Sequence, residues 1–321
     1  MIDVSPHKLV YLSKSGSHLF GTATPKSDLD VKGLFLPSRQ SLYLQNAPQQ
    51  FSQNTNDSSA KNSSDDVDVT VWSVQFWLKL LAKGDINAVS LLFAHTNPDA
   101  ILEGTDTVFL ERLKKLDPKK LLIRNLSGMI GFAYNQAIKY TAKGKHLNAV
   151  QIAITVLSEA SQGMIRDVAD VIVTQVADES MARVQVGSKG IQQLVLLEKM
   201  FDFTASTAWA LEPLREVEAR YGKRAKLALD QGVDFKAFSH SLRVLEEIRL
   251  LHSSALIVYP HVGEFAKLMR DAKMGALEYG MLIEALDRKL EEARTAEISS
   301  VLPAKVDPSY AEDFLLSLYE D

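Results

Sequence analysis

Three aspartates stand in two segments that a β-sheet could bring together. Asp28 and Asp30 are two residues apart in the segment 28–36, whose apolar residues predict a strand, so both side chains should leave the same face. Asp68 lies on the polar face of a second predicted strand, 66–73, in which valines alternate with polar residues. If the strands pair, the carboxylates converge, and carboxylates so crowded repel each other unless a cation lies among them.

An oxygen-rich cluster of this kind is typical of a magnesium site. Magnesium binds through a few carboxylates together with waters and substrate phosphates. Two Mg²⁺ ions, or Mn²⁺ ions in their place, would activate an attacking oxygen and stabilise the leaving one in an in-line phosphoryl displacement. We therefore predict Asp28, Asp30 and Asp68 as metal ligands and catalytic residues. Asp66 shares a face with Asp68 and could replace it if the register slips by two residues.

A turn of small residues precedes the aspartate pair. Gly16 permits unusual backbone dihedrals and a close approach of phosphate to backbone N–H groups, and the Ser17 hydroxyl can donate to a phosphate oxygen. A lone Asp-x-Asp pair is usually a solvated turn or strand end. The order Gly-Ser, about ten residues, then Asp-x-Asp instead indicates a phosphate cradle followed by metal ligands.

These segments resemble a known signature. Residues 16–21 (Gly-Ser-His-Leu-Phe-Gly) and 27–33 (Ser-Asp-Leu-Asp-Val-Lys-Gly) look like that of the DNA polymerase beta superfamily of nucleotidyltransferases. The chain is most similar to the bacterial and phage branch that is associated with RNA repair. Residues 68–93 resemble that branch's third-carboxylate strand and the helix after it, and 236–243 with 259–260 resemble its C-terminal helix.

The resemblance implies a role for each matched residue. Gly16 and Ser17 would hold a nucleoside triphosphate, and Asp68 would act as base for the acceptor hydroxyl or lie close to it. Lys236, His240 and Arg243 lie at i, i+4 and i+7 and so share one helix face. That face could meet the triphosphate, and the alternative is an ordinary solvated helix face. The predicted nucleotide-binding residues are Gly16, Ser17, Lys236, His240 and Arg243. Ser90 departs from the branch, in which we expect an acidic residue there.

The activity that the resemblance implies is transfer of NMP from an NTP to a hydroxyl, with release of pyrophosphate. The link of the branch with RNA repair makes an RNA 3′ end the expected acceptor. Two alternatives stay open. One is the same chemistry on a protein hydroxyl, as in toxin–antitoxin nucleotidyltransferases, and the other is a non-catalytic module that binds nucleotide or nucleic acid on the same fold.

Composition limits the class of protein. The chain has 321 residues and a formal net charge of −4, so any contact with nucleic acid must come from a local basic patch or from metal-bridged phosphates. It has no cysteine, which excludes disulfides and Cys-based zinc sites. No apolar run approaches the ~18 residues of a membrane span, and residues 1–6 lack the pattern of a signal peptide. We expect a cytoplasmic protein without a membrane partner.

Outside the predicted site, the spacing of apolar residues predicts mostly helices. Residues 45–66 contain few large apolar side chains and should form a mobile loop. Residues 74–95 look helical with a break near Gly84, and helices are expected almost throughout from residue 105 onward. The later candidate helices cover 118–143, 146–162, 189–221, 222–231, 234–254, 261–271 and 275–296.

Together these elements predict an α+β fold. A small N-terminal mixed-sheet nucleotidyltransferase domain is expected over 1–110. A mostly α-helical domain over 111–321 would close the nucleotide cleft and select the acceptor. Within it, 168–176 and 184–186 could each be strand or helix.

Overall fold

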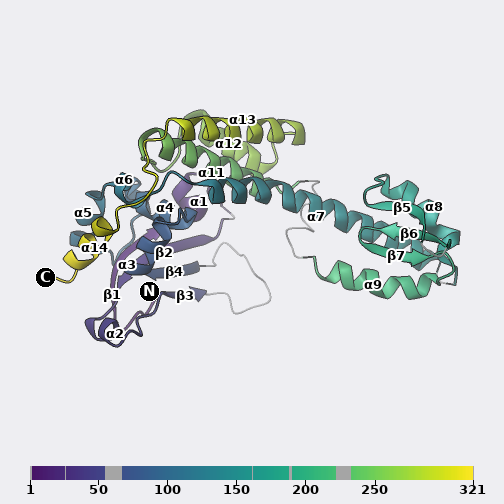
Figure 1. Ribbon diagram of the computed structural model, residues 1–321, viewed down its shortest axis with the longest axis horizontal. Coiled ribbons are helices and arrows are strands. Elements are labelled where there is room, and N and C mark those ends of the chain that lie inside the picture. The colour runs from purple at the N-terminus through teal and green to yellow at the C-terminus, as the bar shows by residue number, and fades with distance from the viewer. Residues whose placement is uncertain are drawn as a thin grey trace. The chain divides into compact units, whose positions relative to one another are not determined.

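The computed structural model describes residues 2–25, 27–54, 67–160, 162–187, 190–221 and 233–320 (Figure 1). It divides into two compact units. Unit 1 comprises Met1–Tyr134 and Ser239–Asp321, and unit 2 comprises Asn135–Phe238. This division differs from the expected boundary at residue 110, because the C-terminal helices belong to the same unit as the N-terminal sheet and the middle of the chain forms a unit of its own.

Unit 1 is built on a four-stranded sheet of order β1-β2-β4-β3. Its strands are β1 (Lys8–Lys14), β2 (Leu29–Leu36), β3 (Gln50–Asn54) and β4 (Val67–Ser73). The central pair, β2 and β4, is parallel, and β1 and β3 flank it antiparallel. The prediction of a loop over 45–66 is therefore wrong for 50–54, which gain ladder hydrogen bonds from β4, and 55–66 lie outside the described residues.

The alternation of side chains along β2 and β4 separates an apolar from a polar face. The apolar face builds a core of Ile2, Val4, Leu12, Val31, Phe35 and Val71. The opposite face carries Asp30 and Asp68 near the start of β2 and β4 and then becomes apolar, with Leu34 and Trp72 buried. Alternation in sequence thus decides which side of the sheet can hold charge.

Short helices follow the strands of unit 1. They are α1 (Gly16–Phe20), α2 (Arg39–Tyr43), α3 (Val74–Leu81) and α4 (Ile86–Phe93). The break predicted near Gly84 is confirmed between α3 and α4, where Gly84 has a φ of +69°. The Asp85 carboxylate then starts α4 by accepting from the backbone N–H groups of Asn87 and Ala88 at 2.9 and 3.0 Å.

Further helices complete unit 1. They are α5 (Thr107–Lys114), α6 (Pro118–Leu121), the first part of α7 (Ser127–Glu159), most of α11 (Phe235–Ser254), α12 (Gly263–Met274), α13 (Tyr279–Ile298) and α14 (Pro308–Ser317), besides two 3₁₀ turns, η1 (Ala94–Thr96) and η2 (Pro98–Ala100). Within unit 1, the Ser241 hydroxyl of α11 donates to the backbone oxygen of Ala133 on α7 at 2.6 Å. The last three expected helices are confirmed, whereas the two expected over 118–162 are instead α6 and a single long α7.

Unit 2 combines helices with a small antiparallel sheet. Beyond its parts of α7 and α11 it contains α8 (Ile165–Val176), β5 (Ala182–Val186), β6 (Gln192–Leu196), β7 (Lys199–Asp202) and α9 (Thr207–Ala219). The strands pair in the order β5-β6-β7 over a core that includes Val150, Ile172, Leu194 and Phe201. The predicted helix 189–221 is wrong before residue 207, because a short apolar run fits a strand as well as a buried helix. The helix expected over 222–231 lies outside the described residues.

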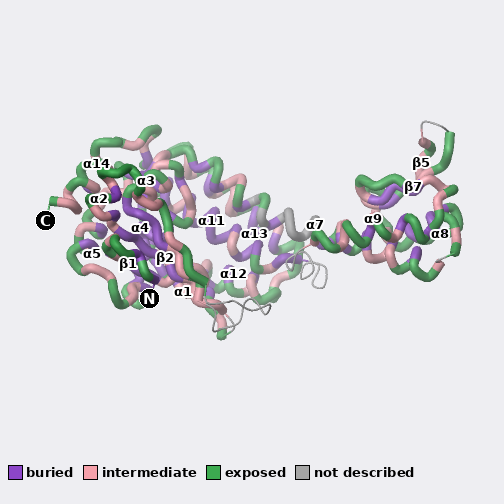
Figure 2. Tube along the Cα trace, turned by 90° about the horizontal axis from the view of Figure 1, so that it is seen from below, coloured by how far each residue is buried: buried purple, intermediate pink, exposed green. Residues whose placement is uncertain are grey.

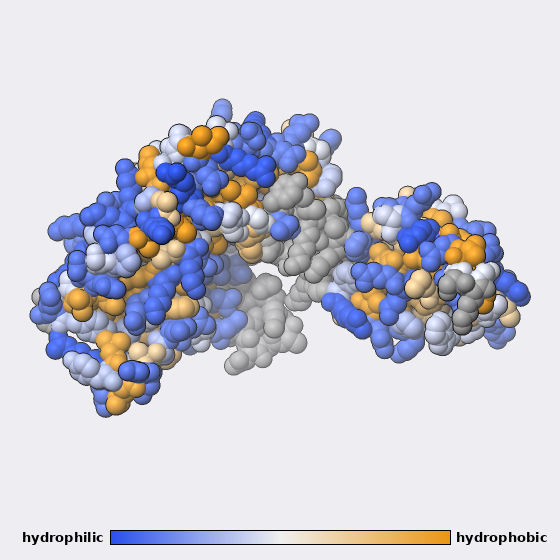
Figure 3. Space-filling model, in the orientation of Figure 1, coloured by the Kyte–Doolittle hydropathy of each residue, from blue (hydrophilic) through white to orange (hydrophobic). Residues whose placement is uncertain are grey.

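Buried residues follow these elements. Figure 2 shows them along β1, β2 and α11 in unit 1 and along α8 in unit 2. The α+β fold class is confirmed, with an N-terminal mixed sheet followed by a mostly helical region. In Figure 3 hydrophilic residues dominate the visible surface of both units, with apolar residues in small patches. None of the described helices has the length and apolar character to cross a membrane.

Candidate active site

The register of the central strands brings two of the three predicted aspartates to one face of the sheet. Asp30 of β2 is the direct partner of Asp68 of β4, and because the strands are parallel their side chains leave the same face. Asp28 lies two residues before Asp30, immediately before β2 begins at Leu29. Asp28 and Asp30 are half-buried, and Asp68 is exposed. The alternative ligand Asp66 lies outside the described residues.

Register places the backbones of Asp30 and Asp68 side by side, but the carboxylates themselves are not gathered around one point. In the described parts of the chain, no three His, Asp or Glu side chains lie close enough to hold a metal ion. Paired residues of neighbouring strands are nevertheless only ~4.8 Å apart, so rotation of the side chains of Asp30 and Asp68 would let both reach one ion. The oxygen-only donors and the shared face fit a hard cation such as magnesium.

The Gly-Ser turn lies directly against Asp30. The N–H of Ser15 donates to the backbone oxygen of Asp30 at 2.7 Å. Gly16 has a φ of +58°, and a Cβ placed on it would overlap Asp30 Oδ2 and lie 3.2 Å from Cγ. A glycine is therefore required here both by conformation and by space. Ser17, the next residue, is half-buried in α1.

Lys32 is a charged neighbour of the aspartates that sequence reasoning missed. It is two residues after Asp30 on the same face of β2, and its Nζ lies 5.1 Å from the centre of the Trp72 ring. Burial lowers the pKa of Lys32, and the nearby carboxylates of Asp30 and Asp85 act in the opposite direction. Its spacing from Asp30 was a signal that could have found it, since side chains two apart on a strand share a face.

Two cations of α12 bind the loop that leads from α1 to Asp28. Lys273 Nζ donates to the backbone oxygen of Thr22 at 2.7 Å and lies 3.4 Å from the Ser27 hydroxyl. Arg270 donates to the backbone oxygen of Gly21 at 3.4 Å. These side chains are about 250 residues away in sequence, so only the tertiary fold reveals their contact with the site.

The three basic residues predicted on one helix face have different surroundings. Lys236 is exposed and belongs to unit 2. His240 is half-buried in unit 1, where its ring lies 5.9 Å from that of Phe132, edge to face. Arg243 is buried, and its Nη2 lies 3.3 Å from His240 Nδ1. The structure therefore brings His240 and Arg243 together, and Arg243 also covers Phe20 of α1, with its Cζ 3.8 Å from the ring centre.

A buried ionic cluster surrounds Arg243. Its Nη1 donates to Glu247 Oε2 at 2.6 Å, and the other oxygen of Glu247 accepts from the Tyr259 hydroxyl at 2.8 Å and lies 3.4 Å from His261 Nε2. Burial acts to raise the pKa of Glu247, but Arg243 and His261 outweigh it and the pKa falls to about 2. Burial, together with the charge of Glu247, raises the pKa of Tyr259 well above its ordinary value.

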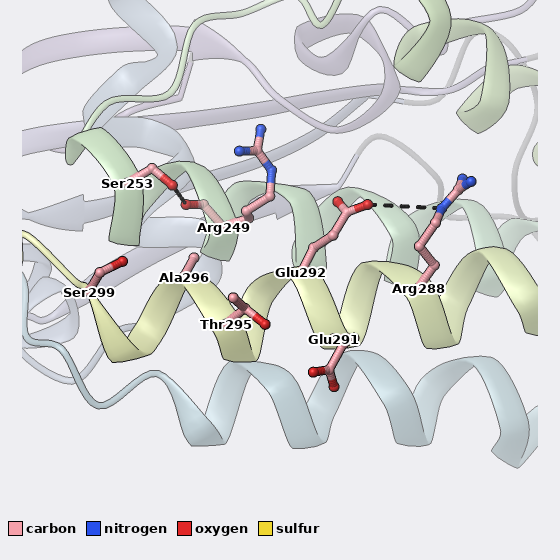
Figure 4. Close-up of a pocket in the computed structure, with 8 residues that line it drawn as sticks. All are labelled: Arg249, Ser253, Arg288, Glu291, Glu292, Thr295, Ala296 and Ser299. Atoms are coloured by element: carbon pink, nitrogen blue, oxygen red, sulfur yellow. Dashed lines mark hydrogen bonds and ion pairs between the residues drawn. The ribbon is translucent and has the colours of Figure 1, made fainter.

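A groove elsewhere in unit 1 contains none of the predicted site residues. It lies between α11 and α13 and has a volume of about 510 Å³ (Figure 4). Its lining consists of Arg249, Ser253, Arg288, Glu291, Glu292, Thr295, Ala296 and Ser299. Arg249 is bound to Glu246 at 2.6 Å, and Figure 4 shows Arg288 directed at Glu292, so the cations of the groove have carboxylate partners of their own.

Comparison with known proteins agrees with the resemblance seen in the sequence. Residues 2–152 match the RlaP family, described as an RNA repair pathway DNA polymerase beta family. The predicted resemblance to that branch is confirmed for this part of the chain, which includes α1, β2 and β4. The chain is 28% identical over 331 residues to the uncharacterized 38.9 kDa protein in the nrdC-mobD intergenic region of Enterobacteria phage T4, covering 97% of each. No solved structure matches the chain.

Proposed function

We propose that this protein is a metal-dependent nucleotidyltransferase that moves NMP from an NTP to the 3′ hydroxyl of an RNA. The observation that carries the proposal is the pairing of Asp30 with Asp68 across two parallel strands, with Asp28 two residues earlier and the Gly16 turn against the Asp30 carboxylate. Carboxylates on one face, next to a turn that leaves room for phosphate, are what phosphoryl transfer needs.

Each element of the site has a role in this reaction. Asp28, Asp30 and Asp68 would hold two divalent ions, Mg²⁺ or Mn²⁺, which supply charge neutralisation on the triphosphate and polarise the acceptor oxygen. The backbone at Gly16 and the hydroxyl of Ser17 bind the phosphates. Asp68 is the exposed member of the three and accepts the proton of the acceptor hydroxyl. The hydroxyl oxygen then bonds to the α-phosphorus, and pyrophosphate leaves.

Basic residues around the carboxylates complete the proposal. Lys32 lies beside Asp30, and Lys273 binds the loop before Asp28, so positive charge borders the place where the triphosphate would lie. Such charges stabilise the leaving pyrophosphate. We propose that His240 of α11, half-buried next to Arg243, extends this border, whereas the predicted role of Lys236 stays a prediction.

The matched family supports both the chemistry and the acceptor. Its description names a polymerase beta family and the RNA repair pathway, which favours an RNA end over a protein hydroxyl. The relative in phage T4 is uncharacterized and adds no acceptor of its own. The net charge of −4 is consistent with contact to RNA through metal-bridged phosphates and a local set of cations.

Label transfer tests the proposal. The protein is incubated with Mg²⁺ and each α-labelled NTP in turn, together with total RNA or total protein, and the labelled fraction is identified. We expect label at RNA 3′ ends, its loss on chelation, and its loss in Asp30→Asn but not in Asp170→Asn, an exposed aspartate of unit 2. Label in protein alone would support the toxin–antitoxin alternative, and label in neither fraction would support the non-catalytic one.

A further inference from the structure

Helix α1 is short, so its position depends on what holds its two ends. It has only the five residues Gly16–Phe20. Its first end is fixed at β2, by the Ser15 N–H bonded to the Asp30 backbone and by the close approach of Gly16 to the Asp30 carboxylate. A helix of this length has too few internal hydrogen bonds to hold its own geometry, and the second end therefore needs an anchor as well.

The second end of α1 is anchored in the buried cluster of α11. The guanidinium of Arg243 covers Phe20, with its Cζ 3.8 Å from the centre of the ring. The rings of Phe20 and Tyr259 have their centres 5.5 Å apart. A Cβ on Gly21, which ends the helix with a φ of +80°, would lie 3.0 Å from Pro260 Cβ and 3.2 Å from the His261 backbone oxygen. The α1 terminus is thus packed tightly on the residues that surround Glu247.

Most of the guanidinium of Arg243 is engaged in this packing. Its Nη1 donates to Glu247, its Nη2 lies next to the His240 ring, and Phe20 covers one face of the guanidinium plane. The remaining Nε is buried and has no hydrogen-bond partner among the described residues. Only 5% of the Arg243 side chain is exposed, which leaves little of it for a triphosphate. The neighbouring His240, by contrast, is half-buried.

We infer that Arg243 is a positioning residue that sets the place of α1, whose first two residues are Gly16 and Ser17, and does not bind the nucleotide itself. The inference rests on the proposed function, since it assigns the way in which that site is held. It separates Arg243 from His240 and Lys236, with which it shares a helix face. Glu247 acts indirectly through Arg243, because its carboxylate accepts from the guanidinium and orients it.

A double-substitution cycle between Arg243 and Phe20 distinguishes positioning from direct binding. We expect Arg243→Lys and Phe20→Leu each to raise the KM for NTP on the order of tenfold, with the KM for RNA unchanged. The double variant should be no worse than the more affected single one, because both changes release the same end of α1. Additive effects, or a normal KM in Phe20→Leu beside a raised one in Arg243→Lys, would overturn the inference.

Controls separate positioning from loss of fold. Arg249→Lys alters another Arg–Glu pair of the same helix, with Glu246 at 2.6 Å, and should leave the KM unchanged. Thermal unfolding shows which variants stay folded, and Tyr259→Phe offers a milder change at the same cluster.

Equilibrium binding of each NTP with Mg²⁺ gives the same cycle without turnover. If NTP binds but nothing is transferred, the proposed function fails while the coupling is still measured. If the unsubstituted protein binds no NTP, both fail.

Discussion

Two sets of charged side chains in unit 1 are assembled in opposite ways. The aspartates of β2 and β4 are gathered by strand register on a face that remains open at Asp68. Arg243 and Glu247 are four residues apart on α11, pair at 2.6 Å, and are 5% and 0% exposed. The first, acidic set gathers like charges on one face of the sheet, whereas in the second, balanced set a cation and a carboxylate pair directly.

Charged side chains thus serve two purposes in unit 1, fixing helices in one set and offering a site for a cation in the other. A buried pair with both partners in place holds helices in fixed positions, and it is costly to break because one charge is left in an apolar surrounding. Carboxylates gathered on one face do not stabilise the fold by themselves, since like charges repel. They become useful when a cation such as Mg²⁺ binds among them, and the fold keeps them where Asp68 is exposed.

Breaking the acidic set should give the largest effect on activity. In Asp30→Asn we expect nucleotidyl transfer to fall about a thousandfold, because losing a metal ligand removes several kcal/mol of transition-state stabilisation. The free energy of unfolding should be unchanged or slightly raised, since repulsion between carboxylates is relieved. Initial rates with α-labelled NTP and urea unfolding measure the two. A comparable loss in Asp170→Asn would contradict a specific role.

Breaking the balanced set should affect stability first. Glu247→Gln leaves the buried Arg243 without its carboxylate, and we expect the free energy of unfolding to fall by about 3–5 kcal/mol. The exposed pair of Glu111 with Lys114, at 2.7 Å, provides the matched control, because Glu111→Gln should change stability little. Denaturant unfolding followed by circular dichroism is the measurement. Equal losses in both variants would show that burial of the pair is unimportant.

Acid should weaken the balanced set over a defined range. The pKa of Glu247 is about 2 in the folded protein against an ordinary 4.5, so its contribution to stability is present above pH 4.5 and is lost as the pH falls toward 2. The contribution amounts to about 3 kcal/mol. Unfolding free energies measured across this range should fall less steeply in Glu247→Gln. Parallel curves for the two proteins would contradict this assignment.

Substitution of Gly16 should lower the stability less than substitution of Glu247 does. Gly16→Ala adds a Cβ that overlaps the Asp30 carboxylate at a φ of +58°. We expect about 1–2 kcal/mol of destabilisation from the left-handed backbone, and a loss of transfer from displacement of the carboxylate. Gly263 has a φ of +67°, and a Cβ added there would meet no described atom within 4 Å, so Gly263→Ala should share the strain but keep the activity. Similar rates in both would contradict the steric role of Gly16.

The acidic set could be predicted from the sequence because its signals are local. Alternation along β4 and the spacing of Asp28 and Asp30 determine the faces of their strands, and only the pairing of the strands needed the structure. The environment of Arg243 could not be predicted in the same way. Helical spacing places it on a face with Lys236, but its contacts with Phe20 and Tyr259 depend on long-range packing.

The fold shows the same limit. The later helices of unit 1 have strong helical periodicity and were predicted correctly. The strands β6 and β7 are four or five residues long, and a run of that length carries no period that separates strand from helix. The boundary of the units was also hidden, since α7 and α11 continue through it without any break in their sequence pattern.

Unit 2 is continuous in sequence, whereas unit 1 is made of two separate stretches of chain. The chain leaves unit 1 after Tyr134 and re-enters it at Ser239, and just inside these points Ser241 donates to the Ala133 backbone at 2.6 Å. Inserted domains are tolerated where entry and exit lie close together. Unit 2 therefore has the architecture of an exchangeable module, with its own core, that a short turn could replace while the acidic sheet and the Arg243 cluster stay intact.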